Sequence, residues 1–273
     1  MWNIAGLWSL PWWGYLAIAL IFTHITITGV TIYLHRSQAH RALELRAPLA
    51  HFYRFWLWLT TGMVTKEWVA IHRKHHARCE MDGDPHSPIV WLRPVVGKWK
   101  RAFAMMRFVL WVGVLKYVRE SHIPETMERY GAQTPDDWVE HNVYARFPKV
   151  GVSLMLIVNF ICFGTWGLLI WAIQMLWIPI FAAGVINGVG HFLGYRNFES
   201  MHRKTGVVDS SKNILPWGIL IGGEELHNNH HANEVSPKLS AKWFEFDIGW
   251  FYITLFRWVG LIKHIRLDRP YPT

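Results

Sequence analysis

The sequence predicts an all-α integral membrane protein with about three transmembrane helices, interfacial amphipathic helices and a histidine-rich cap on the cytoplasmic side. Hydrophobic residues make up 52% of the 273 residues, and 18 residues are tryptophan. Residues 1–35 and 150–195 contain no Asp, Glu, Lys or Arg. Many of the 16 histidines cluster in short motifs beside these stretches. Because no linker, repeat or low-complexity tract divides the chain, we expect a single domain over residues 1–273.

The two uncharged stretches predict the membrane spans. A helix needs about 20 apolar residues to cross a hydrocarbon core of ~30 Å. The first stretch therefore fits one span, at about residues 13–34, and the second fits a hairpin of two spans, at about 150–170 and 172–191. A cleavable signal peptide is not expected, because the first stretch lacks a basic start and is longer than a signal's apolar core.

The other elements are expected at the membrane surface. Residues 1–12, rich in Trp, suit an interfacial anchor. Residues 50–76 and 102–118 carry apolar runs too short to span, so we expect helices in or near the interface. Residues 119–148 are polar and predict an exposed excursion, and residues 243–262 predict another surface helix.

Charge orients the chain in the membrane. The formal net charge is +9, and all 28 Lys and Arg residues lie outside the two uncharged stretches. The positive-inside rule then places Arg36–Lys149 and the segment from Arg196 onward in the cytoplasm. Basic residues near spans suit anionic lipid headgroups, so we expect a membrane partner and no nucleic acid.

Four histidine motifs carry the chemistry: HRSQAH, HRKHH, NGVGH and HNNHH. Imidazole is a common ligand for iron, zinc and copper, and the i, i+3, i+4 spacing of HxxHH puts three rings on one arc of a helix of about 100°. One octahedral metal takes only six ligands, so the set suits two metals in a di-metal cap. The expected ligands are His35, His40, His72, His75, His76, His191, His227, His230 and His231.

The spacing of two residue pairs in these motifs predicts how the pairs are oriented. His35 and His40 are five residues apart, about 140° around an ideal helix, so the helix is expected to end or unwind near Arg36. Asn187 and His191 are four apart at the end of the last predicted span. The Asn187 amide could orient a metal-bound water, because it offers both a donor and an acceptor.

Polar residues near the motifs are candidates for orienting the metal ligands. A carboxylate that accepts the distal imidazole N–H fixes the tautomer of a ligating histidine. A role at a helix start is equally open for the two glutamates before HNNHH. The candidates are Asp82, Asp84, His86, Glu224 and Glu225.

Together, HRSQAHR, HRKHHARCEMDGDPHS, NGVGH and GEELHNNHH resemble the membrane acyl desaturases of the stearoyl-CoA desaturase type, from about Ile25 to Leu261. The resemblance implies two iron ions, or zinc as a substitute, held by the nine histidines, with Asn187 acting through a water. It also implies O2 as co-substrate and a cis double bond introduced into a saturated acyl chain, at the delta-9 position. The chain departs from the family in having one predicted span before the first motif and in the residues Glu225 and Leu226.

The resemblance also implies partners and a location. The acyl substrate would be carried on CoA, a carrier protein or a lipid. The sequence contains no recognisable electron-transfer domain, so we expect a separate donor such as a ferredoxin, a rubredoxin or a cytochrome b5-like protein, with its reductase. With only three predicted spans, the chain resembles a compact form of the family. This form suggests a bacterial inner membrane, with the metal site on the cytoplasmic face.

Three alternatives are weighed against this interpretation. A related di-iron hydroxylase, or a decarboxylase that forms terminal alkenes, would use similar motifs. A metal transporter or storage protein would place ionisable residues inside the spans, where this chain offers only His24 and His191. A zinc hydrolase would need a general base, and HRKHH lacks the Glu of HExxH.

Overall fold

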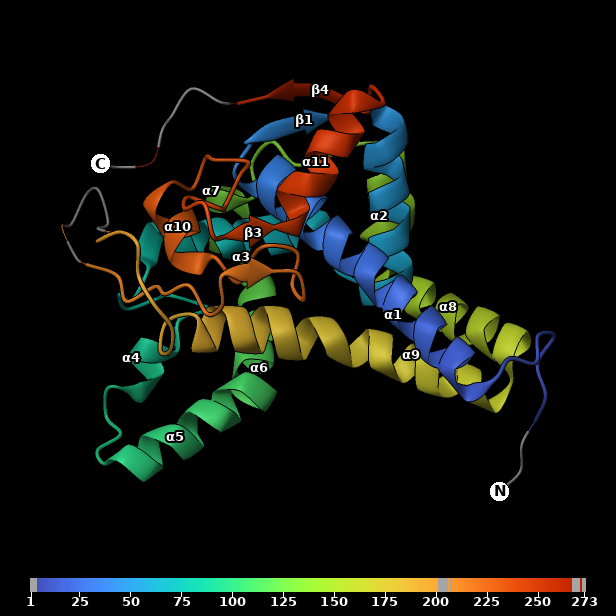
Figure 1. The fold of residues 1–273 in the computed structure, drawn as a ribbon, viewed down its shortest axis with the longest axis horizontal. Coiled ribbons are helices and arrows are strands. Elements are labelled where there is room, and N and C mark those ends of the chain that lie inside the picture. Colours follow the sequence, from blue (N-terminus) through green and yellow to red (C-terminus); the bar gives the residue numbers. More distant parts are fainter. Residues whose placement is uncertain (1–3, 201–205, 207, 267–270, 272–273) are drawn as a thin grey trace.

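The computed structural model describes residues 4–200, 206, 208–266 and 271, and this part of the chain is mostly helical with two short two-stranded sheets. In Figure 1 the helices α1, α8 and α9 converge near the N-terminus. The opposite ends of α1 and α9 reach a cap built from shorter helices, among them α3 and α10. The cap carries the histidine motifs.

The first long helix is α1 (Trp12–Thr28), which continues without a break into the π-helix η1 (Gly29–Ala39). At its end the amide of His40 donates to the carbonyl of His35 at 3.1 Å. An i→i+5 bond closes a wider turn than an α-helix has, so residue i+5 lies about one turn above residue i. The helix was expected to end or unwind near Arg36. It leaves α-helical geometry earlier, at Gly29, and ends at Ala39, and the wide turn brings His35 and His40 onto one face.

The second uncharged stretch forms a helical hairpin. Helix α8 (Pro148–Phe163) is followed by α9 (Thr165–Trp177), which continues into the π-helix η4 (Ile178–Val189). The turn is at Gly164, where φ is +59° and a Cβ would lie 1.8 Å from the carbonyl oxygen of Ile4. Only glycine tolerates both conditions. The hairpin therefore turns earlier than the predicted break near residue 171.

Within the described part of the chain, two continuous helices are long and apolar enough to cross a membrane: Trp12–Ala39, with 28 residues, and Thr165–Val189, with 25. Helix α8 is apolar but has 16 residues, fewer than the about 20 needed for an untilted crossing. Two of the three predicted spans thus correspond to candidate membrane helices. The third stays a prediction.

Short elements connect these helices into the cap. The predicted helix over residues 50–76 is two helices separated at Gly62, and the polar excursion over residues 119–148 contains a helix and a π-turn. The helices are α2 (Ala47–Thr61), α3 (Thr65–Arg78), α4 (Pro88–Leu92), α5 (Lys98–Arg107), η2 (Phe108–Val112), α6 (Gly113–Ser121), α7 (Pro124–Tyr130), η3 (Glu140–Tyr144), α10 (His227–Ala232) and α11 (Ile248–Trp258).

Two small sheets tie distant segments together. Strand β1 (Leu43–Leu45) pairs antiparallel with β4 (Ile262–Ile265), and β2 (Trp217–Gly218) pairs parallel with β3 (Phe246–Asp247). The first sheet anchors the C-terminal segment beside the end of η1, which lies just before β1. It continues an apolar core shared by η1, α2 and α11.

Two buried arginines, Arg36 and Arg54, connect segments of the fold through hydrogen bonds and ion pairs. The Arg36 side chain, 1% exposed, donates to Asp247 Oδ1 at 3.0 Å and to the Gly222 carbonyl at 3.2 Å. Arg54 on α2 donates to both carboxylate oxygens of Asp137 and to Glu140 Oε2 at 2.9 Å. Each arginine therefore joins segments that are far apart in the sequence.

We expect Arg54→Ala to destabilise the protein strongly, because it leaves the buried Glu140 carboxylate without its cation, at a cost of about 3–5 kcal/mol. The matched control is Lys263→Ala, which removes an exposed ion pair to Glu44 and should cost about 1 kcal/mol or less. Thermal unfolding of both variants in detergent checks this. Equal unfolding temperatures would contradict the role given to Arg54.

Candidate metal centre

The structure gathers the nine predicted histidines into two adjacent groups. Their ligand atoms lie within 4.8 Å of one another inside each group. The neighbours in each HxxHH motif separate: His75 and His231 belong to one group, and His76 and His230 to the other. The full groups are His35, His40, His72, His76 and His230, and His75, His191, His227 and His231.

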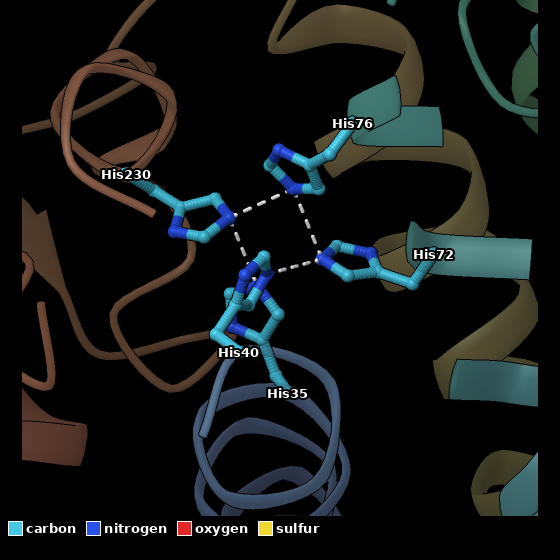
Figure 2. Close-up of side chains that lie close together, drawn as sticks. All are labelled: His35, His40, His72, His76 and His230. Atoms are coloured by element: carbon cyan, nitrogen blue, oxygen red, sulfur yellow. Dashed lines mark hydrogen bonds between the residues drawn. The ribbon is translucent and has the colours of Figure 1, made fainter. Parts of the chain in front are cut away.

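In the five-histidine group the rings aim their Nε2 atoms at a common centre (Figure 2). The Nε2 atoms of His40 and His72 are 2.8 Å apart, and those of His72 and His76 are 3.1 Å apart. His230 Nε2 lies 3.0 Å from His76 Nε2 and 3.1 Å from His35 Nε2. The rings come from η1 and the residue that follows it, from α3 and from α10, so three parts of the chain converge on one point.

The four-histidine group is built the same way. The Nε2 atoms of His191, just after η4, and of His227, at the start of α10, are 3.0 Å apart. His75 Nε2 and His231 Nε2 are buried and have no hydrogen-bond partner within the described part of the chain. Two buried ring nitrogens without a partner need one, since such atoms are costly to leave unmatched.

Carboxylates contact the outer nitrogens of several of the rings. His35 Nδ1 donates to Glu224 Oε1 at 2.8 Å, and His75 Nδ1 donates to Asp84 Oδ1 at 2.9 Å. His191 Nδ1 lies 3.0 Å from Glu80 Oε1. A proton on Nδ1 leaves a lone pair on Nε2.

Inward lone pairs at these distances repel one another unless a cation lies between them. The donor set therefore fits a metal ion in each group, because neutral imidazole nitrogens are good ligands for first-row transition metals. Five and four nitrogens leave room for a further ligand on at least the second metal.

Burial favours the neutral, ligand-competent form of the rings. It is the main cause that lowers the pKa of His72, His227 and His230 well below 6.5, and neighbouring histidines lower it further. Burial also lowers the pKa of His76 to about 4, although Glu234 opposes it. His231 differs: burial lowers its pKa, but the stronger combined effect of Asp209 and other carboxylates raises it above 6.5.

The carboxylates stay ionised despite their burial. Burial alone would raise the pKa of Asp84, but His75 and the backbone amides of His86 and Glu80 hold it below its usual value. Likewise, burial raises the pKa of Glu224, and His35 and Arg36 more than offset this. Their negative charges can balance the positive charge of bound metals.

The residues that were predicted to orient the metal ligands differ in how close they lie to the histidines. Asp84 and Glu224 contact histidines, whereas the Asp82 side chain is 92% exposed and pairs with Arg93 at 3.0 Å. Glu225 accepts from the backbone amides of Ile221 and Gly223 and so shapes the turn before α10.

Two more of the predicted residues, His86 and Asn187, lie close to the histidine groups. The His86 ring is 5.6 Å from that of His75, and its own amide donates to Asp84. Asn187 lines a cavity together with His227. Asn187 therefore lies near the four-histidine group, where its side-chain amide could hold a metal-bound water.

Three carboxylates were missed by the sequence reasoning: Glu80, Asp209 and Glu234. Asp209 Oδ2 lies 3.5 Å from His231 Nδ1, and Glu234 Oε1 lies 3.3 Å from His76 Nδ1. Glu80 has a left-handed φ of +59° and also accepts the backbone amide of Ser210 at 2.7 Å. Proximity to HRKHH was the signal for Glu80, but no local pattern marks Asp209.

Cys79 also lies beside the second group, with its Sγ 3.9 Å from His231 Nδ1. Burial is the main cause that raises the pKa of its thiol well above the usual value, and nearby carboxylates raise it further. The thiol is therefore held protonated.

A cavity of about 240 Å³ runs beside both groups. His35, His72 and His227 form part of its wall, and most of the remaining lining is apolar. Trp68 stacks on His72, with ring centroids 4.9 Å apart and an angle of 12° between the planes. An apolar ligand in this cavity would therefore lie directly against histidines of both groups.

These features define a mostly helical protein with candidate membrane helices and buried histidine groups that fit a di-metal centre. The chain belongs to the fatty acid desaturase family, whose profile it matches over residues 10–247. It is accordingly an oxidoreductase of lipid metabolism from a membrane enzyme family. The family indicated by the histidine motifs is confirmed.

Curated relatives agree with this assignment. The Delta-9 desaturase-like 2 protein of Arabidopsis thaliana is 27% identical over 259 residues, which cover 93% of this chain and 78% of the relative. The sn-1 stearoyl-lipid 9-desaturase of Anabaena variabilis is 26% identical, with coverage of 93% and 85%. The Delta-9 acyl-lipid desaturase 1 of Arabidopsis thaliana is 27% identical, with coverage of 93% and 76%.

We expect Asp84→Asn to lower metal affinity about 10- to 100-fold, because it removes the charge that fixes His75. Asp82→Asn is the matched control, since that side chain is exposed and contacts no ring of either group in the described contacts. Metal content after titration with a chelator, measured by mass spectrometry, checks this. An equal loss in both variants would contradict a specific role for Asp84.

Proposed function

We propose that this protein is an O2-dependent di-iron desaturase that introduces a cis double bond into a saturated fatty acyl chain, at the delta-9 position. The observation that carries the proposal is the pair of histidine groups that converge beside an apolar cavity in a member of the desaturase family. The names of its relatives support the position of the double bond.

The two irons would be held by the five-histidine and four-histidine groups. Asn187 would complete the second through a water, which its place beside His227 supports. When bound, the irons supply the oxidising power that, with O2 and two electrons, removes two hydrogens from adjacent carbons. Zinc would fit the same nitrogens but has no redox chemistry.

The chain's own residues position the substrate. Trp68, on the apolar wall of the cavity, packs on His72, which belongs to the metal-holding wall, so the two walls are in direct contact. The apolar lining excludes water from the acyl chain. The three Nδ1-bound carboxylates Glu80, Asp84 and Glu224 keep the rings from rotating, which limits where the attacked carbons can lie.

We further propose three spans, with α8 flanked by interfacial residues over a locally thinned bilayer, and a bacterial inner membrane with the centre on its cytoplasmic face. The 28 basic residues outside the two uncharged stretches support this orientation. We take the whole chain, residues 1–273, as one desaturase domain.

A lipid is the acyl carrier that we favour over CoA or a carrier protein. Two relatives are named as acyl-lipid or stearoyl-lipid desaturases. The α6 segment lends Val114, Tyr117 and Val118 to the cavity wall, and its neighbours Trp111 and Leu115 are exposed and apolar. Such a surface suits the bilayer. Electrons would come from a separate ferredoxin, rubredoxin or cytochrome b5-like protein with its reductase.

We expect cells that express the protein to gain a monounsaturated fatty acid, with its double bond located by derivatisation and gas chromatography–mass spectrometry. His230→Ala should lower this product more than about 100-fold and release iron, because it removes a ligand rather than an orienting group. His122→Ala should change little, since that side chain is exposed. New hydroxy acids or terminal alkenes would instead favour the hydroxylase or decarboxylase.

A further inference from the structure

The cavity extends away from the histidines along one face of the α9–η4 helix. Its lining follows that helix from Asn187 through Ile186 and Ile178 to Gln174. These end points are 13 residues apart in one continuous helix, at most about 20 Å at 1.5 Å per residue. The cavity lining also includes Ile27 on α1 and Thr60 and Thr61 on α2. Among the lining residues on α9 and η4, Gln174 is the one farthest along the helix from His191.

A buried amide pair marks this far end. Gln174, 2% exposed, lines the cavity, and its Oε1 accepts from Asn159 Nδ2 at 3.3 Å. Asn159 is fully buried on α8 and also donates to the Met155 carbonyl at 3.0 Å. Gln174 Nε2 and Asn159 Oδ1 have no hydrogen-bond partner in the part of the chain that the structure describes.

One donor and one acceptor are thus left over in a single hydrogen-bonded amide pair between α8 and α9. A buried polar group without a partner is costly. A single water can serve both atoms, since it can accept from the Gln174 amide and donate to the Asn159 oxygen. Hydrocarbon can satisfy neither.

We propose that Gln174 and Asn159 form the polar end of the acyl cavity and determine the longest acyl tail that the enzyme accepts. The inference rests on the proposed function, because it takes the cavity as the site of the acyl chain. A methyl end that stops short of the pair leaves its water in place. A longer tail must displace a water whose hydrogen bonds it cannot replace, which lowers affinity.

A purely structural role would give a different result. Amides between helices can hold α8 against α9 in a membrane, and in that case their loss would change stability and overall rate for all chain lengths alike. The ratio of products from long and short chains separates the two roles.

The test uses the full chain in membranes, supplied with its redox partners and an equal mixture of saturated acyl chains of graded length. The main variant is Gln174→Leu with Asn159→Leu, because replacing both partners with similar apolar side chains leaves no unmatched polar atom. We expect the product ratio of chains beyond the wild-type limit to preferred chains to rise about tenfold. An unchanged ratio at measurable activity would overturn the proposal.

A second variant covers a failure of the first to fold. Gln174→Trp should fill the end of the cavity and move the preference toward shorter chains, and an unmoved preference would also count against the proposal. Leu176→Ala is the control, because it lies on the same helix and its side chain is 57% exposed. It should leave the ratio unchanged.

The wild-type result separates the two hypotheses. A wild-type protein that forms no unsaturated product under any condition would sink the proposed function. One that desaturates, but whose length ratio is the same in both Gln174 variants, would sink only the inference. A readout without turnover adds to this: stabilisation against heat by saturated fatty acids should level off at the wild-type length limit and extend further in the double leucine variant.

Discussion

The hydrogen bond from an imidazole Nδ1 to a buried carboxylate is the interaction on which the centre depends. Glu224 joins His35 across 189 residues of sequence, and Glu80 joins His191 across 111. Each bond does two things at once: it closes the cap over a long loop, and it turns a lone pair toward the middle. Three of the converging rings, those of His35, His75 and His191, have their outer nitrogens held in this way. Folding of the cap and preparation of the centre are therefore one process.

Charge balance explains the rest of the cap. Several carboxylates beside the rings are ionised and buried, so they need cations, and Arg36 lies 3.9 Å from Glu224 while it bonds Asp247. Metal ions would neutralise the side that faces the rings. The arginine neutralises the outer side, which places a permanent positive group in the wall between η1 and α11.

The sequence predicted the parts that follow from local periodicity. HRKHH and HNNHH lie on helices α3 and α10, as their i, i+3, i+4 spacing predicted, because that geometry is local. The uncharged stretches marked both long helices. The turn at Gly164 was misplaced, because composition alone did not show that Ile4 packs against it.

Contacts between segments that are far apart in the chain could not be predicted from the sequence. Asp82 and Asp84 are two residues apart with the same chemistry, yet only Asp84 turns inward, since the loop after α3 exposes the other. Asp209 meets His231 only because two segments without shared periodicity are brought together. The π-helical end of η1 was also missed, because no residue preference distinguishes it from an α-helix over so short a length.

The wide winding of η1 has a thermodynamic consequence. In an α-helix His35 and His40 would diverge by about 140°, so only the π-form presents both rings to one point. Whatever binds both rings must therefore favour the wide winding, and by linkage the wide winding must favour that ligand by the same free energy. The pitch of this candidate membrane helix and the affinity of the centre at its end are then two measures of one equilibrium.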